Sequence, residues 1–280
     1  MVTYVITHIL AESTAKTIDK INYSRHRINS RQKMFIVFLT MSVSTLIYTA
    51  IFKQSDPNIV PLSVFALIMI AILSFVGNVF DELSLKADDL SLREPLIDFE
   101  PMLAGLVGYV LFPNERKPIY LIVFIIGFFI VRWGIHRRKL NADESRGLKY
   151  LVLAVAIYGI LPSLYKVALE YVSPSQLLLF RVLFIFIFTT IRSNLNEIRK
   201  LSIRQLHYGV ASGLVYSLGA MASLYAIKSY GVVFTMLFFM LGPALRYLSS
   251  KFILKERVRS GEVTSSLMLA VLVAFAALIG

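Results

Sequence analysis

The chain has 280 residues, of which 57% are hydrophobic, and its mean hydropathy is +0.70. A soluble domain averages about 45–50% apolar residues, so this composition excludes a soluble protein and indicates a membrane protein. The net charge of +12 is explained by positive loops at a membrane surface, and nucleic-acid binding is not expected because there is no soluble module to carry it. Cysteine is absent, and the four histidines show no metal spacing such as HExxH, so we expect no metal and no cofactor.

Ten apolar segments follow one another along the chain, each close to the roughly 20 residues that a membrane-spanning helix needs. They cover residues 2–21, 34–52, 59–80, 90–113, 118–136, 148–165, 175–192, 206–227, 231–254 and 263–279. The first and the fourth carry charged residues, and the connections between segments are short. We therefore predict an all-α membrane protein with ten transmembrane helices and no separate soluble domain.

Two lysine-anchored spacings of 15 residues occur in both halves of the chain. They run from Lys16 to Arg31 and from Lys166 to Arg181, then from Lys86 to Pro101 and from Lys228 to Pro243. A repeat of about half the chain length, in a membrane protein, is typical of transporters built from two related halves around a central site. We predict one five-helix repeat over residues 1–140 and a second over residues 141–280.

The positive residues are unevenly divided between the two sides that ten helices define. The connections after the first, third, fifth, seventh and ninth helices hold 21 Lys and Arg residues, and those on the opposite side hold 5. The positive-inside rule then places both termini outside the cytoplasm. We expect the cell membrane, meaning a plasma or bacterial inner membrane, as the location.

Short motifs recur in the same order within the repeat. In the second half, a lysine, a short turn and an arginine that opens the next helix are followed by a small-residue helix, an intrahelical proline and a Glu-Arg pair before the last helix. The residues are Lys166, Arg181, Lys228, Pro243 and Glu256-Arg257, and the first half has Glu115-Arg116 at the place of the last pair. This order resembles the drug/metabolite transporter superfamily, specifically its EamA-like ten-helix branch.

The resemblance implies two five-helix repeats inserted in opposite orientations, because an odd helix number per repeat forces the inversion. It also implies a secondary active transporter rather than an enzyme. We expect it to export a small metabolite or drug-like compound by alternating access, with proton coupling or exchange as the source of energy. The expected partners are a small-molecule substrate and the lipid bilayer, and the chain would act as a monomer or a homodimer.

Acidic residues mark a difference between the halves. Seven of the 17 lie in residues 81–100, whereas the matched stretch 223–242 has none. A charge at the bilayer centre costs about 2.5–3.5 kcal/mol, so it normally faces a watery cavity or a partner. Asp98 and Glu94 are four residues apart and share a face of a helix. We predict that they bind a cationic group of the substrate or carry a coupling proton.

A second polar stripe lies on the first predicted helix. His8, Glu12 and Lys16 follow at intervals of four residues, and Asp19 continues the stripe. Glu12 is a candidate for the same roles as Asp98, and Lys16 is a further candidate residue of the substrate or coupling-ion site. A plain i,i+4 pair between Glu12 and Lys16 is the alternative.

Further candidates are basic, aromatic and backbone-breaking residues. Arg246 and Lys228 would hold an anionic group, although Lys228 also suits a helix end that reaches the membrane interface. Tyr225 and Tyr158 would offer aromatic walls, although many tyrosines are interface anchors. Pro101, Gly242 and Pro243 are predicted hinges, because proline interrupts the helical hydrogen-bond ladder. Gly209 and Gly213 form a GxxxG spacing that lets helices pack closely.

Two other classes of function remain open. A membrane-embedded lipid or prenyl-diphosphate transferase would bind Mg²⁺–diphosphate through the ligands Asn78, Asp81, Glu82, Asp88 and Asp89. A non-transporting membrane scaffold would have its acids paired off with Lys and Arg.

Overall fold

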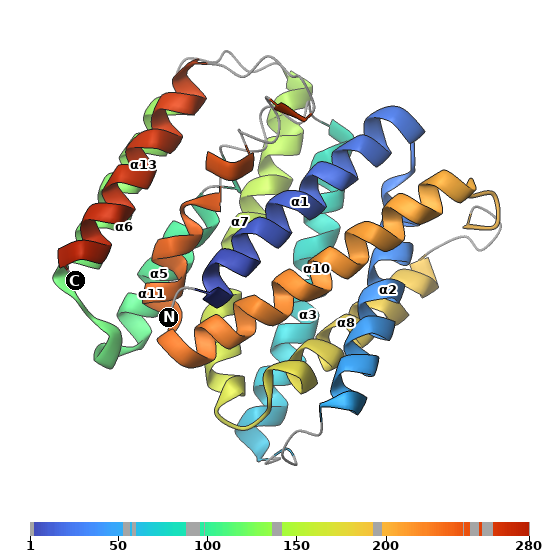
Figure 1. The fold of residues 1–280 in the computed structure, drawn as a ribbon, viewed down its shortest axis with the longest axis horizontal. Coiled ribbons are helices and arrows are strands. Elements are labelled where there is room, and N and C mark those ends of the chain that lie inside the picture. Colours follow the sequence, from blue (N-terminus) through green and yellow to red (C-terminus); the bar gives the residue numbers. More distant parts are fainter. Residues whose placement is uncertain are drawn as a thin grey trace. The chain divides into compact units, whose positions relative to one another are not determined.

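The computed structural model describes residues 3–52, 57, 60–87, 96–97, 99–135, 142–192, 198–242, 244–246, 252–253 and 260–279. Over these residues the chain is helical and contains no strand. The α-helices in this part of the chain are α1 (Thr3–His26), α2 (Ser30–Ile51), α3 (Pro61–Ala87), α5 (Phe99–Leu111), α6 (Pro118–Ile135), α7 (Ala142–Leu169), α8 (Pro174–Arg192), α10 (Ile203–Tyr230), α11 (Val232–Phe239) and α13 (Ser260–Ile279), with a 3-10 turn η1 (Pro113–Glu115) (Figure 1). The all-α prediction is confirmed for the described residues, and the ten helices agree in order with the ten predicted segments.

Several of these helices are long and apolar enough to cross a bilayer. Among the described residues five pass on length and hydropathy: Ser30–Ile51, Pro61–Asp81, Gly147–Leu169, Pro174–Arg192 and Ile203–Tyr230. Shorter apolar helices include Phe99–Leu111, Pro118–Trp133 and Val263–Ile279. At 1.5 Å of rise per residue, about 20 residues span the roughly 30 Å hydrocarbon core. Helix α1 does not meet these criteria because charged residues run through it.

The chain forms two compact units, and each unit draws on both halves of the sequence. Unit 1 consists of Met1–Phe75 and Val167–Lys228, and unit 2 of Val76–Lys166 and Ser229–Gly280. Two of the repeated lysines, Lys166 and Lys228, thus stand at the ends of unit segments. The repeats at 1–140 and 141–280 are predicted from similar motifs in the two halves of the sequence, not from packing, and they stay a prediction.

Unit 1 is held together by packing of α8 against α2 and of α10 against both α1 and α2. Helices α2 and α8 lie side by side (Figure 1), with the rings of Phe35 and Phe186 5.6 Å apart. Small residues of α10 bring it onto its neighbours: Gly209 faces Ile36, Gly213 faces Thr40 of α2, and Gly219 faces Ala11 of α1. The GxxxG spacing therefore serves helix packing, as predicted.

The turn between α1 and α2 is short and tightly specified. Arg27 adopts a positive φ of 51°, which ends α1. Asn29 then caps α2: its side chain accepts a hydrogen bond from the Arg31 N–H, and Gln32 accepts one from the Asn29 N–H. Gln205, near the start of α10, donates to the carbonyl of His26 at 2.7 Å. These contacts bring the first turn of α2 close to the last turns of α1.

Unit 2 packs α5 against α6 and α11, and α13 against α6. Glycines again allow close approach. Gly105 of α5 lies under the ring of Phe124, Gly108 meets Val232 at the start of α11, and Gly159 of α7 meets Leu103. In lipid, such small-residue contacts replace the hydrophobic driving force that packs helices in water.

Adding a methyl group at Gly213 tests this packing. A Cβ there would lie 2.9 Å from the carbonyl oxygen of Val37, which is backbone and has little room to move. We expect Gly213→Ala to destabilise the protein by about 1–3 kcal/mol, as overpacking does. The matched control is Gly261→Ala in α13, where an added Cβ meets nothing within 4 Å. Thermal unfolding of the purified protein should show a lower midpoint for Gly213→Ala alone, and equal midpoints for the two variants would refute the packing argument.

Candidate functional site

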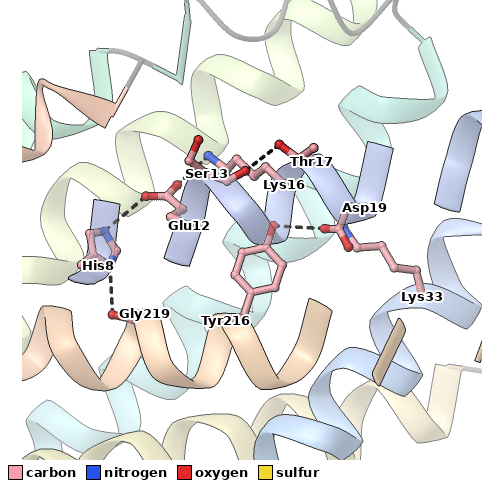
Figure 2. A network of polar contacts seen from close by, with 9 residues as sticks. All are labelled: His8, Glu12, Ser13, Lys16, Thr17, Asp19, Lys33, Tyr216 and Gly219. Carbon is pink, nitrogen blue, oxygen red and sulfur yellow. Dashed lines mark hydrogen bonds and ion pairs between the residues drawn. The ribbon is translucent and has the colours of Figure 1, made fainter. Parts of the chain in front are cut away.

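Helix α1 carries a polar face in unit 1. His8, Glu12, Lys16 and Asp19 follow at intervals of four, four and three residues, which places them on one side of the helix. Figure 2 shows this stripe beside α10, with Lys33 of α2 reaching its far end. The predicted stripe on the first helix is therefore present. We call these residues and their partners on α2 and α10 the α1 polar network.

The first part of the network is a chain of contacts from His8 to Lys16. The Nδ1 atom of His8 lies 2.9 Å from the carbonyl oxygen of Gly219 on α10. Its Nε2 atom lies 3.2 Å from Oε2 of Glu12, whose Oε1 pairs with the Lys16 ammonium at 2.6 Å. The side chains of His8, Glu12 and Lys16 are 15%, 29% and 25% exposed. The ion pair expected as the alternative reading of Glu12 is thus formed, and the pair also includes a histidine.

The second part of the network surrounds Asp19, which is only 5% exposed. One oxygen of its carboxylate accepts a hydrogen bond from the Ser212 hydroxyl at 2.5 Å, and the other accepts one from the Tyr216 hydroxyl at 3.0 Å. Lys33 forms an ion pair with the same carboxylate. A buried charge costs several kcal/mol unless it is both paired and hydrogen-bonded, and Asp19 meets both conditions.

Helix α10 supplies one face to both parts of the network. Ser212, Tyr216 and Gly219 are spaced four and three residues apart, so they point to the same side. Because Gly219 has no side chain, α1 comes close enough for His8 to reach its carbonyl. The small-residue pattern of α10 therefore positions polar groups as well as packing the helices.

An aromatic cluster lies one turn before His8. Tyr4 of α1 stacks on Tyr225 of α10 with ring centroids 5.4 Å apart, and the hydroxyls of Tyr225 and Tyr48 are 3.4 Å apart. Phe52 packs on Tyr48 at 4.5 Å. Three helices thus contribute rings, and the predicted site residue Tyr225 stands among them.

The structure brings some predicted site residues together and leaves others apart. Glu12, Lys16 and Tyr225 belong to unit 1, within or beside the α1 polar network. Tyr158 belongs to unit 2, where its ring lies over Gly77. Lys228 is exposed at the end of α10.

The remaining predicted residues are placed as follows. The guanidinium of Arg246 lies beside Gly242 in unit 2. Pro101 is the third residue of α5, in its first turn, where the missing N–H removes no hydrogen bond of that helix. Asp98, Glu94 and Pro243 lie outside the described residues.

Some residues of the network did not stand out as site residues in the sequence. Asp19 continues the stripe three residues after Lys16, so a helical-wheel reading could have ranked it. Lys33, Ser212 and Gly219 carry no such signal, because they reach the site only through tertiary contacts.

A second ionic cluster lies in unit 2, around Glu115 of η1. Its carboxylate pairs with Lys166 near the end of α7, and one of its oxygens accepts the Val233 N–H at 2.8 Å. The Lys166 ammonium also stands 4.1 Å from the centre of the Phe112 ring. Lys166 and the Glu-Arg pair are two of the motifs that carry the family resemblance, and here they make one contact.

Glu115 acts as a helix cap supplied by another segment. Gly231, the N-cap of α11, has a φ of 82° and no side chain to cap the helix. The Glu115 carboxylate satisfies one of the free N–H groups and favours the positive end of the helix dipole. Arg116 completes the pair by donating to the carbonyls of Tyr109 and Val110 at 2.9 and 2.7 Å, near the end of α5.

Among the described residues, no group of three or more His, Cys, Asp or Glu side chains lies together in a way that could hold a metal ion. Of the ligands considered for a transferase, Asp88, Asp89 and the side chain of Glu82 lie outside the described residues.

Five apolar helices of spanning length in the described part of the chain indicate an integral membrane protein. Residues 145–279 match the model of the EamA-like transporter family, which confirms over these residues the resemblance to the drug/metabolite transporter superfamily.

The fold is shared with a solved structure over nearly the whole chain. That structure, titled only "Crystal structure of protein", superposes with a TM-score of 0.77 at 13% identity, covering 99% of this chain and 96% of the other. At this identity the likeness concerns the fold alone. No curated protein matches the sequence.

Removing the positive partner of Asp19 tests the inner part of the network. Lys33→Met would leave a buried carboxylate without its counter-ion, which typically costs about 3–5 kcal/mol. The double variant Asp19→Asn/Lys33→Met should recover part of that loss, because it leaves no buried charge. Unfolding curves of the two single variants and the double variant measure the coupling, and strictly additive effects would contradict the pairing.

Neutralising Glu115 tests the second cluster. We expect Glu115→Gln to destabilise the protein by about 1–3 kcal/mol, since a charge-assisted bond to α11 and the ion pair to Lys166 are both weakened. Glu170→Gln, an exposed acid just after α7, is the control and should leave the unfolding midpoint unchanged. Identical midpoints for the two variants would show that Glu115 does not cap α11.

Proposed function

We propose that this protein is a secondary active transporter that exports a small metabolite or drug-like compound by alternating access. The observation that carries the proposal is the α1 polar network, which keeps charged groups on a helix of a membrane protein whose residues 145–279 match the model of a transporter family. Charges within membrane helices are expensive, and they usually mark substrate or ion pathways. The first half of the chain shares its fold with the solved structure together with the second half, since the match covers 99% of this chain.

The proposed architecture is a pair of inverted five-helix repeats, 1–140 and 141–280, in the cell membrane with both termini outside the cytoplasm. Two lines of sequence evidence support it, namely the repeated lysine spacings and the positive bias of one set of loops. The protein would catalyse no chemical reaction and would draw its energy from a proton gradient or from exchange.

The proposed binding residues fall into two groups, one supported by both sequence and structure and one by the sequence alone. Glu12, Lys16 and Tyr225 are supported by their grouping in unit 1. Asp98, Glu94, Arg246, Lys228 and Tyr158 are proposed from the sequence pattern, with Gly242 and Pro243 as hinges. The carboxylates would accept a cationic group or a proton, and the tyrosines would stack against an apolar or aromatic part of the substrate.

A membrane scaffold is the second candidate, and one observation favours it. Three described acids, Glu12, Asp19 and Glu115, are each paired with a lysine, as a purely structural role would require. A measurement of flux distinguishes the scaffold from the transporter.

The test of the proposed function first measures ligand binding and then measures transport of the bound compound. A thermal-shift screen of the purified protein against a metabolite library, at two pH values, identifies compounds that stabilise the folded state by mass action. The strongest stabiliser is then followed into proteoliposomes. Saturable flux supports the transporter, whereas no flux of any stabilising compound would favour the scaffold.

Glu12 provides the variant for this assay. We expect Glu12→Gln to reduce flux at least about tenfold, because the amide keeps the shape of the side chain and loses its charge and its ion pair. Glu170→Gln is the control with normal flux, and both proteins should elute as folded monomers or dimers. Unchanged flux in Glu12→Gln would remove Glu12 from the site, and Asp98→Asn would then test the other acidic candidate.

A further inference from the structure

His8 stands between two hydrogen-bond acceptors. Its Nδ1 faces the carbonyl oxygen of Gly219 at 2.9 Å, and its Nε2 faces a carboxylate oxygen of Glu12 at 3.2 Å (Figure 2). A carbonyl oxygen can only accept, so Nδ1 must carry a hydrogen. A neutral imidazole has one N–H, which Gly219 then uses. The contact with Glu12 therefore needs one more proton, placed on Nε2 or on the carboxyl group.

Loss of that proton forces a choice between the two contacts. With a single N–H, the ring can donate to Gly219 on α10 or to Glu12 on its own helix, but not to both. A hydrogen bond to a charged carboxylate is roughly twice as strong as one to a neutral carbonyl. The remaining hydrogen should then be carried by Nε2 and donated to Glu12. The hydrogen bond from His8 of α1 to the Gly219 carbonyl of α10 is then lost.

We propose that His8 and Glu12 together bind a single proton that clamps α1 to α10, and that this proton is the coupling ion of the transporter. The inference rests on the proposed function for its second part, whereas the clamp itself is a property of unit 1. Binding adds one positive charge to the triad of His8, Glu12 and Lys16, and release returns the proton to water. Histidine suits this task because it is the side chain whose ordinary charge change falls between about pH 5 and pH 8.

The groups around His8 fit a site that is sensitive to one proton. On α1 itself, Tyr4, Glu12 and Lys16 lie within one or two turns. From α10, the phenol of Tyr216 interacts electrostatically with Glu12 and Asp19, and Tyr225 stacks on Tyr4. From α2, Lys33 is engaged by Asp19, and Tyr48 faces Tyr225. The Gly219 carbonyl, which His8 reaches on α10, cannot bind the proton, so the proton resides on the His8 ring or on the Glu12 carboxyl group.

Imidazole NMR of the whole protein tests the proton site. The chain has four histidines, so ¹⁵N-histidine labelling gives few signals, and the His8 signal is assigned by its loss in His8→Phe. We expect the His8 ring to hold hydrogens on both nitrogens at low pH and to lose one as the pH rises. A ring that stays in one protonation state from about pH 5 to pH 9 would overturn the proposal.

Spin labels test the clamp. Since the chain has no cysteine, Leu10→Cys on α1 and Leu218→Cys on α10 introduce two labels at exposed positions without background. The inter-label distance distribution should change with pH in step with the His8 titration. His8→Phe should abolish the change, and His207→Phe, at an exposed position of α10, should preserve it. A distribution that ignores pH, or that responds equally in both variants, would refute the clamp.

Flux measurements separate this inference from the proposed function. A pH gradient should stimulate transport in the parent protein and not in His8→Phe. Flux that a pH gradient drives equally in both would leave the transporter standing and remove His8 as its proton site. A titrating His8 with a pH-dependent distance but no flux of any compound would sustain the clamp and overturn the transporter.

Discussion

A buried carboxylate has to find its counter-charge and its hydrogen bonds within the protein, since an apolar interior supplies neither. In unit 1 this requirement organises three helices. Asp19 of α1 is satisfied only when α2 brings Lys33 and α10 brings Ser212 and Tyr216 to the same point. The short capped turn before α2 and the small residues of α10 make that meeting possible. The same contacts therefore pack the three helices together and satisfy the charge of Asp19.

The two ends of the α1 polar network, at Asp19 and at His8, differ in burial and in the hydrogen bonds that they form. Around Asp19, both carboxylate oxygens are engaged and the group is buried, which is the arrangement of a structural ion pair. Around His8, the partners are a neutral carbonyl and a carboxylate that already pairs with Lys16, and the side chains are partly exposed. The two arrangements differ in the number of protons that they require. Asp19 forms its ion pair and both hydrogen bonds without an additional proton, whereas His8 keeps both of its contacts only while an extra proton is present.

Glu115 in unit 2 is also a carboxylate paired with a lysine, but it caps a helix. Its carboxylate holds Lys166 and caps α11 at a glycine that cannot cap itself. The motifs of the family resemblance thus acquire a physical meaning: the lysine at the end of one helix and the Glu-Arg pair after another meet at the start of a third. Such a contact stabilises a helix break, and helix breaks in a membrane protein are tolerated where protein groups satisfy the exposed backbone.

By itself, the sequence determined the class of fold and the location of its charges. Long apolar segments with short connections leave helices as the only structure that satisfies the backbone in lipid, and the spacing of His8, Glu12, Lys16 and Asp19 follows from the helical period. The motif order identified the family. The tertiary structure alone decided which charges meet: that Asp19 faces Lys33 and Tyr216, that Glu115 caps α11, and that His8 reaches the carbonyl of Gly219. Those pairings join residues as much as 211 positions apart. They depend on how closely the helices approach, a property of side-chain volumes and turns that no local pattern encodes.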